Sequence, residues 1–200
     1  MYLFIGLGNP GKEYVSTRHN AGRDIVMSWC KKEALDDIRA DAELTADIAR
    51  GLVAGQKAVC ILPNTMMNKS GAAVAKASSR YKIKPEKIVV VHDDADISVG
   101  NAKMSFGKHS AGHKGVESVI RALKTRDFWR IRIGIAGKRD IPAEKIVLKK
   151  WTPEEAALIK KTEKRAIAAL AQILADGPEK AMMEFNTRSG RKNSTAKSRR

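Results

Sequence analysis

The alternation of short apolar runs with segments of helical periodicity constrains the fold of this chain more than any other feature of its sequence. The run at 87–91 is β-branched almost throughout, which is typical of a strand buried in a sheet. Residues 21–35 place apolar side chains at helical spacing, with Asn20 as the predicted N-cap. Further strands are predicted at 2–7, 102–106 and 128–135, a hairpin at 44–48 and 58–62, and further helices at 70–81 and 116–123. The alternation predicts a single α/β domain with a mixed, mostly parallel β-sheet flanked by helices.

The element with the clearest boundaries is a long helix late in the chain. Thr152 is its predicted N-cap, Pro153 occupies its first position, and Glu155 completes a capping box with Thr152. The helix is expected to end at Gly177, because glycine is favoured just past a helix C-terminus and a proline follows directly. A short last helix is predicted over 179–185.

The charge of the chain is large and unevenly spread. Its 38 Lys and Arg residues exceed its 22 Asp and Glu residues by 16, and six of the cations lie in residues 188–200. That segment has no large apolar residue, so we expect residues 1–187 to form the folded domain and 188–200 to be a basic tail, disordered when free. The folded part keeps a surplus of ten positive charges. Such a surplus favours a polyanionic partner, above all a nucleic acid.

Several protein classes are excluded by what the sequence lacks. Cys30 and Cys60 are too few for a disulfide scaffold and lie in no zinc-ligand pattern. No apolar run approaches the roughly 18–20 residues that cross a bilayer, so no membrane association is expected. Residues 1–7 read as a strand rather than a signal peptide, so we expect a cytoplasmic protein.

A glycine-rich loop, GLGNPG at residues 6–11, directly follows the first predicted strand and matches a dinucleotide-binding pattern. That pattern requires a helix to begin within the motif, so that backbone N–H groups point at a pyrophosphate. Here Pro10 interrupts the loop and helical periodicity begins only near residue 21. A tight turn, with Gly8 and Gly11 at unusual backbone angles, is therefore the favoured interpretation.

Four polar clusters each follow a strand-like run. The first holds Asn9, Tyr14, Arg18, His19 and Asn20, and the others are PNTMMNKSG at 63–71, HDDAD at 92–96 and GKHSAGHKG at 107–115. Ligands of open α/β sheets bind at the carboxyl ends of the strands, so we expect these clusters to converge on one crevice.

The residue types in these clusters favour hydrolysis. No G-x-S-x-G nucleophile motif is present. The only dense metal-ligand pattern is the group at 92–96, and it is a weak one. What remains is a histidine that activates water, with His19 as the base, Asp93 accepting from its other ring nitrogen, and Asn9 among the amides that position the scissile group.

Taken together, the clusters resemble the bacterial-type peptidyl-tRNA hydrolases. GLGNPGKEYVSTRHNAG resembles the N-terminal signature of that family almost position for position, and PNTMMNKSG, VVVHDDADISVG, RIRIGI and AMMEFN resemble its later segments in order. The resemblance covers the chain from residue 1 to about 186. It implies an esterase that hydrolyses the bond between peptide and tRNA, usually a cytoplasmic monomer that needs no metal and no organic cofactor.

The resemblance also implies roles for individual residues. His19 matches the general base, Asp93 the carboxylate that orients it, and Asn9 the residue that separates peptidyl from aminoacyl substrates. Substrate contacts are implied for Tyr14, Met66 and Asn68, and phosphate contacts for Lys103 and Arg132.

The chain departs from the family in its fourth cluster. Lys108 and His109 replace glycines, and Lys114 replaces an asparagine that can both donate and accept hydrogen bonds, whereas a lysine only donates. Lys114 is a candidate for contact with the ester carbonyl or a terminal phosphate, and His109 and His113 are possible supporting bases. These departures leave open a second hypothesis, an RNA-binding relative in which hydrolysis is weak or lost.

Overall fold

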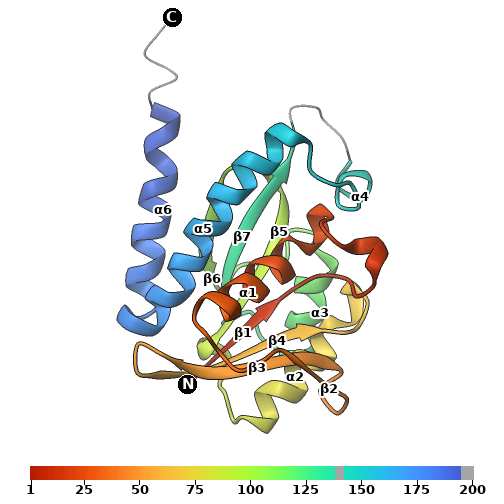
Figure 1. Ribbon diagram of the computed structural model, residues 1–200, viewed down its shortest axis with the longest axis vertical. Helices are drawn as coiled ribbons and strands as arrows, with labels where there is room; N and C mark the ends of the chain where they lie inside the picture. Colours follow the sequence, from red (N-terminus) through yellow and green to blue (C-terminus); the bar gives the residue numbers. More distant parts are fainter. Residues whose placement is uncertain (138–141, 195–200) are drawn as a thin grey trace, which may run out of the picture.

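A mixed β-sheet organises the part of the chain described by the computed structural model, residues 1–137 and 142–194 (Figure 1). Its seven described strands lie in the order β2-β3-β4-β1-β5-β7-β6. They are β1 (Tyr2–Gly6), β2 (Arg39–Asp41), β3 (Ala46–Val53), β4 (Gln56–Pro63), β5 (Ile88–Ser98), β6 (Ala102–Phe106) and β7 (Trp129–Ala136).

Strand direction confirms the predicted mixed, mostly parallel sheet. β4, β1, β5 and β7 are parallel neighbours, whereas β3 and β6 run antiparallel to the strands beside them. Parallel strands are joined by crossovers that place helices on the sheet faces, which accounts for the helical segments between them.

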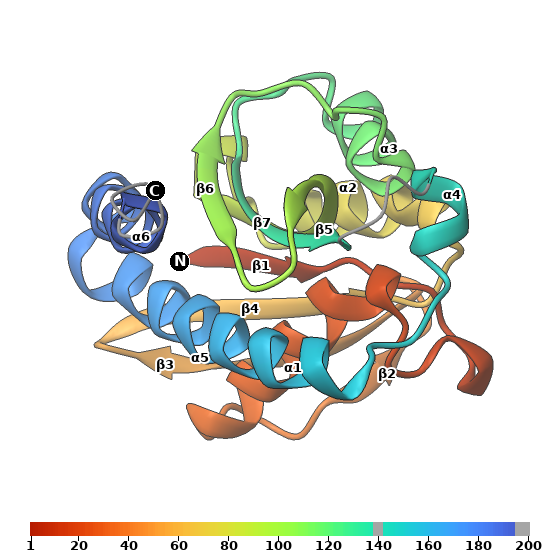
Figure 2. The same ribbon diagram turned by 90° about the horizontal axis from the view of Figure 1, so that it is seen from above.

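The helices form a layer on each face of the sheet. α1 and α5 pack on one face, and α2 and α3 on the other (Figure 2). α6 lies beside β6, where the Asn186 side chain donates to Met104 O and accepts from Met104 N. The helices are α1 (Ala21–Lys32), α2 (Ser70–Arg80), α3 (Lys114–Leu123), α4 (Ala143–Ile146), α5 (Pro153–Asp176) and α6 (Pro178–Ser194), with 3-10 turns η1 (Lys12–Tyr14), η2 (Arg18–Asn20), η3 (Met67–Lys69) and η4 (Pro85–Lys87).

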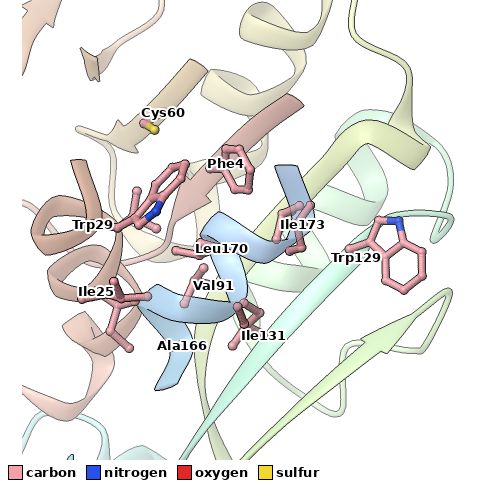
Figure 3. Close-up of a cluster of buried hydrophobic side chains, with 14 of the residues drawn as sticks. Phe4, Ile25, Trp29, Cys60, Val91, Trp129, Ile131, Ala166, Leu170 and Ile173 are labelled. Carbon is pink, nitrogen blue, oxygen red and sulfur yellow. The ribbon is translucent and has the colours of Figure 1, made fainter. Parts of the chain in front are cut away.

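The larger apolar core lies between the sheet and the α1–α5 layer (Figure 3). The Trp29 side chain of α1 is fully buried there, and its ring centroid lies 4.6 Å from that of Phe4. Cys30 and Cys60 are buried in the same cluster, so both cysteines belong to the core. Burying a large side chain of this kind stabilises the fold by roughly 1.5–3 kcal/mol, which anchors α1 to the sheet.

The boundaries predicted for the late helix are confirmed. Thr152 Oγ1 accepts from the N–H of Glu155, and the Glu155 side chain accepts from the N–H of Thr152. Gly177 follows the helix at φ +91°, a conformation that L side chains rarely adopt.

Some elements differ from the sequence-based expectation. The short strand β2 and the one-turn helix α4 were not predicted. α6 continues to Ser194 rather than ending near residue 185, so the first residues of the predicted disordered tail are helical. A helix that is already anchored by packing adds one hydrogen bond per added residue, so it can extend past its last apolar contact. Residues 195–200 of the predicted tail lie outside the described residues.

Within the described residues, none of the helices combines the length and the apolar character that a membrane crossing requires.

An acidic residue of α1 makes the contact with α5 sensitive to pH. Burial and the nearby Glu163 raise the pKa of Asp24 to about 6, against the opposing effect of Arg23. Because the folded state binds this proton more tightly than the unfolded chain, the ionised carboxylate destabilises the fold, and this cost grows as pH rises from about 4 through 6. We expect Asp24→Asn to raise the free energy of unfolding at pH 8 by roughly 1–2 kcal/mol.

Urea unfolding of both proteins at pH 4.5 and pH 8 measures this effect. The stabilisation should shrink at the lower pH, and Glu163→Gln should reproduce part of it at pH 8, since the charge of Glu163 is the second cause of the shift. An equal gain at both pH values would contradict the explanation.

Candidate active site

The predicted polar clusters meet in a cleft of about 530 Å³ at the carboxyl ends of β1, β4 and β5. Convergence of the four clusters is therefore confirmed. The cleft is lined by Asn9, His19, Met66, Met67, Asn68, Asp93, Asp94, Ala95, Ser110, Ala111, Gly112, His113, Lys114, Glu144, Val147 and Leu148.

The fourth cluster reaches the cleft by a route that differs from the other three. β6 is antiparallel to β7, and its last residue, Phe106, pairs with Trp129 at the start of β7. β6 therefore ends at the edge of the sheet opposite the cleft. The segment 107–113 crosses back to the start of α3, visible as the green arc between β6 and α3 in Figure 2. Seven residues can span at most about 25 Å, which suffices for this crossing.

The glycine loop forms a tight turn, as favoured from the sequence. Gly11 has φ +111°, as predicted, but Gly8 has no positive φ, so its predicted unusual angle is wrong. Gly8 is needed for space instead, because an added Cβ would lie 2.8 Å from Arg23 Cβ and 3.0 Å from Asn20 Oδ1. η1 and η2 separate β1 from α1, so no helix begins inside the motif as dinucleotide binding requires.

Asn9 is held in one orientation by the loop around it. Its backbone N–H donates to Asn20 Oδ1 at 2.8 Å, and the Asn20 amide donates back to Asn9 O at 3.0 Å. Asn20 occupies the predicted N-cap position of α1, but its side chain makes no cap bond because it is engaged with Asn9. The side-chain oxygen of Asn9 accepts from Met67 N–H at 2.8 Å, so the remaining amide nitrogen is available as a donor in the cleft.

His19 is fixed through its own backbone and through its neighbour Arg18. His19 N–H donates to Val147 O at 2.8 Å, and Arg18 N–H donates to Lys149 O at 3.0 Å. The buried Arg18 guanidinium donates to Ile135 O and to Glu155 Oε2, at 3.0 and 2.6 Å. These contacts tie the turn η2 to the segment after α4 and to the start of α5.

His19 Nδ1 lies 2.9 Å from Asp93 Oδ1. Burial opposes ionisation of Asp93, but its interactions with His113 and His19, including a hydrogen bond from each, outweigh burial and hold its pKa well below the ordinary value. Asp93 is therefore an acceptor only, so His19 Nδ1 carries the proton. The other ring nitrogen, Nε2, has no hydrogen-bond partner among the described residues, which leaves it able to accept a proton from a molecule in the cleft.

The acidic cluster lies inside β5 rather than after it, since β5 continues to Ser98. Successive side chains of a strand alternate between its two faces, so His92 and Asp94 lie on the opposite face of β5 from Asp93, although Asp94 also lines the cleft. His92 is buried and donates from Nδ1 to Asp93 O at 2.6 Å, and burial keeps its pKa well below the ordinary value. Asp94 accepts from Arg132 Nε at 2.7 Å. Within residues 92–96, no three side chains bring possible ligand atoms together, so this segment alone is not a candidate metal site.

A different trio, His19, Asp93 and His113, places one possible metal-ligand atom each within 4.8 Å of the others. Those atoms are engaged with each other, because Asp93 Oδ1 also lies 2.8 Å from His113 Nε2. His113 Nδ1 in turn accepts from the N–H groups of Gly115 and Val116. A metal at Nε2 of a neutral imidazole would require the proton on Nδ1, where these two donors exclude it. The arrangement fits a hydrogen-bonded cluster better than a metal centre.

The other predicted residues take different positions. Met66 and Asn68 are exposed and line the cleft, whereas the half-buried Tyr14 lies on η1 and is not a lining residue. Lys114 lines the cleft mouth, with Nζ 3.8 Å from Glu144 Oε1. Of the phosphate-contact candidates, Lys103 is exposed on β6, and Arg132 is paired with Asp94.

Sequence reasoning missed three lining residues, Glu144, Val147 and Leu148. They belong to α4 and the turn after it, a segment without a motif or a clear period. Their presence follows from the backbone bonds that join this segment to His19 and Arg18.

Comparisons with known proteins agree on one family. A sequence profile described as "Peptidyl-tRNA hydrolase" matches residues 3–195. The chain is 38% identical over 186 residues to a peptidyl-tRNA hydrolase of Caldanaerobacter subterraneus subsp. tengcongensis, covering 93% of this chain and all of that protein. The corresponding protein of Aquifex aeolicus is also 38% identical, with 92% of this chain and 95% of that one covered. The crystal structure of the Acinetobacter baumannii peptidyl-tRNA hydrolase superposes with a TM-score of 0.86 at 32% identity, covering 93% and 94% of the two chains.

Proposed function

The chain belongs to the peptidyl-tRNA hydrolase family, an enzyme family of carboxylic ester hydrolases, and on this basis we propose that His19 is the general base that directs water at the ester between peptide and tRNA. The observation that carries the proposal is the 2.9 Å hydrogen bond between His19 Nδ1 and the buried Asp93 carboxylate, which leaves Nε2 facing the cleft without a protein partner among the described residues.

The reaction begins with a water molecule in the cleft. His19 Nε2 accepts a proton from that water as its oxygen attacks the ester carbon, and Asp93 stabilises the resulting imidazolium. The tetrahedral intermediate then collapses, the bond between the acyl carbon and the ribose oxygen breaks, and the imidazolium returns the proton to that oxygen. Water is consumed, and free tRNA and a free peptide are released.

Asn9 supplies a fixed donor to this step. Met67 N–H occupies its side-chain oxygen, so its amide nitrogen alone is left to donate to the substrate carbonyl or to the peptide next to it. A preorganised donor costs no reorientation as negative charge develops in the transition state, which is why fixed amides accelerate acyl transfer. We assign Asn9, with His19 and Asp93, to the catalytic group.

The peptide side of the substrate meets an apolar wall. Met66 and Leu148 are 45% and 54% exposed at the cleft, large values for apolar side chains, and Asn68 adds a polar group to the same lining. Contact with apolar peptide side chains would cover this surface. Tyr14 lies on η1 and is not among the lining residues of the cleft, and we propose that it contacts the peptide as well.

The tRNA is expected to bind through its phosphates. The surplus of ten cations on residues 1–187 can hold a polyanion without reading its sequence, which suits an enzyme that accepts many tRNAs. Lys103 and Arg132 face the same region of β6 and β7 and are the proposed phosphate contacts. We propose that residues 1–187 are the catalytic unit, that it works as a monomer in the cytoplasm, and that it uses no metal or organic cofactor.

Cleavage of an N-blocked aminoacyl-tRNA tests the proposal directly. We expect the full chain to release the blocked amino acid, and to release far less from the same tRNA when the amino group is free. Tight tRNA binding without cleavage would contradict the proposal and favour a non-catalytic RNA-binding relative.

The lysine at the cleft mouth offers a second test. Lys114 and Glu144 are 70% and 85% exposed and 3.8 Å apart, and exposed pairs of this kind contribute only about 0–1 kcal/mol. We therefore expect Lys114→Asn to change kcat/KM for a blocked aminoacyl-tRNA by less than about tenfold. Complete loss of turnover would show that the lysine is an essential part of the site.

A further inference from the structure

His113 contacts the proposed catalytic pair and is also the N-cap residue of a helix. Its side chain is 8% exposed, its Nε2 lies 2.8 Å from Asp93 Oδ1, and its ring centroid is 5.2 Å from that of His19. The same Asp93 oxygen therefore receives bonds from two histidines, one from η2 and one from α3.

The helix decides which nitrogen of His113 carries the proton. His113 is the N-cap of α3, and its Nδ1 accepts from Gly115 N–H at 3.1 Å and from Val116 N–H at 3.2 Å. A nitrogen that accepts from two N–H groups cannot carry a proton of its own. The ring proton of His113 therefore sits on Nε2, where it is donated to Asp93.

Resting on the proposed function, we infer that His113 is a positioning residue whose fixed Nε2–H bond limits how strongly Asp93 can bind the protonated form of His19. A donor on the shared oxygen draws negative charge away from His19 Nδ1, and its positive end lies near the imidazolium that forms there. A base must be unprotonated to accept a proton from water, so this bond keeps His19 active at lower pH than Asp93 alone would allow.

The other charged and titratable groups around His19 are few. Asp94 of β5 lines the cleft but is paired with Arg132, and Lys114 of α3 and Glu144 of α4 are exposed at its mouth. Arg18, next to His19 on η2, is paired with Glu155. On the far side of His113, the buried His92 ring meets it edge-on at 4.7 Å between centroids. None of these groups is altered in the variants below.

Two substitutions separate the two bonds of His113. The side-chain oxygen of asparagine can take the place of Nδ1, so His113→Asn keeps the cap on α3 but cannot reach Asp93. The amide nitrogen of glutamine can take the place of Nε2, so His113→Gln keeps the donor to Asp93 but loses the cap. The pair is matched, because each variant retains what the other removes.

The first measurement follows the His19 ring by NMR as pH is changed, and it needs no substrate. We expect its titration in His113→Asn to move upward by about 0.5–1 pH unit, and in His113→Gln to stay within about 0.2 unit of wild type. His113→Gln should instead show the lower thermal midpoint, because its helix has lost a cap. The ¹⁵N shifts of His113 in the wild-type protein should show a protonated Nε2 and an unprotonated Nδ1.

The second measurement is the pH profile of kcat/KM for a blocked aminoacyl-tRNA, whose acid limb should move to higher pH in His113→Asn alone. Equal titrations of His19 in all three proteins would overturn the inference, as would a protonated Nδ1 on His113 or an equal upward movement in both variants. If the protein bound tRNA without cleaving it, the proposed function would fail, whereas the NMR titration would still decide the role of His113.

Discussion

Replacing His19 with alanine should lower kcat for hydrolysis of a blocked aminoacyl-tRNA by about 10²–10⁴-fold, the usual cost of removing a general base. The variant loses the ring nitrogen of the His19–Asp93 pair that faces the cleft, so the proposed acceptor for the proton of the attacking water is gone. The dissociation constant for tRNA should change little, because the proposed phosphate contacts, Lys103 and Arg132, lie on β6 and β7. Single-turnover kinetics and tRNA binding measured on the same preparation separate the two effects.

The chain offers a matched histidine as control. His109 is exposed, lies near Arg126 and is not a lining residue of the cleft. His109→Ala should therefore keep kcat within about threefold, since exposed substitutions away from a site change little. If His109→Ala lost turnover while His19→Ala kept it, the assignment of the base would be wrong.

Adding one methyl group at Gly22 should cost about 3 kcal/mol of folding free energy, at the upper end of the range for overpacked sites. A Cβ built on Gly22 would lie 2.1 Å from Val91 O and 2.7 Å from Val91 C, which are backbone atoms of the central strand β5. That carbonyl already accepts from Leu7 N–H at 3.0 Å, so it has no room to move. For a chain of this size we expect the thermal midpoint of Gly22→Ala to fall by about 6–12 °C.

The same clash should also disturb the geometry of the active site. Gly22 lies three residues after His19, and its contact at Val91 lies two residues before Asp93. Pushing α1 from β5 therefore moves the two groups apart, and whatever folds should also hydrolyse more slowly. Gly137→Ala is the control, because its added Cβ would find its nearest neighbour, Glu155 Oε1, at 3.8 Å. A wild-type midpoint for Gly22→Ala would show that α1 can shift without cost.

Local patterns in the sequence were enough to predict most elements of this fold. The capping box of Thr152 and Glu155 and the β-branched run at 87–91 are short-range signals, and the structure has both elements. β2 and α4 were missed because three- or four-residue elements carry too few residues for a period to show.

The meeting of His19, Asn9 and Asp93 was also predictable. Asn9 and His19 follow β1, Asp93 lies two residues beyond the last pairing of β5 with β1, and parallel strands share one carboxyl edge. The contributions of α4 and the turn after it were not predictable. Backbone bonds from His19 to Val147 and from Arg18 to Lys149 hold this segment at the cleft, and each joins residues more than a hundred positions apart. Tyr14 is close to His19 in sequence but lies on η1 and is not among the lining residues of the cleft, so its contact with substrate stays a prediction.

The sequence by itself determined the α/β architecture, the family and the histidine–aspartate pair. Local periodicity indicates the architecture, and short contiguous motifs indicate the family and each residue of the pair. Only the tertiary structure decided how His113 is used. His113 follows β6, an antiparallel strand that ends at the edge of the sheet opposite the cleft. The N–H groups of α3, the helix that His113 caps, determine that its proton lies on Nε2. Which nitrogen of a histidine donates depends on partners brought together in three dimensions, and no spacing along the chain records that choice.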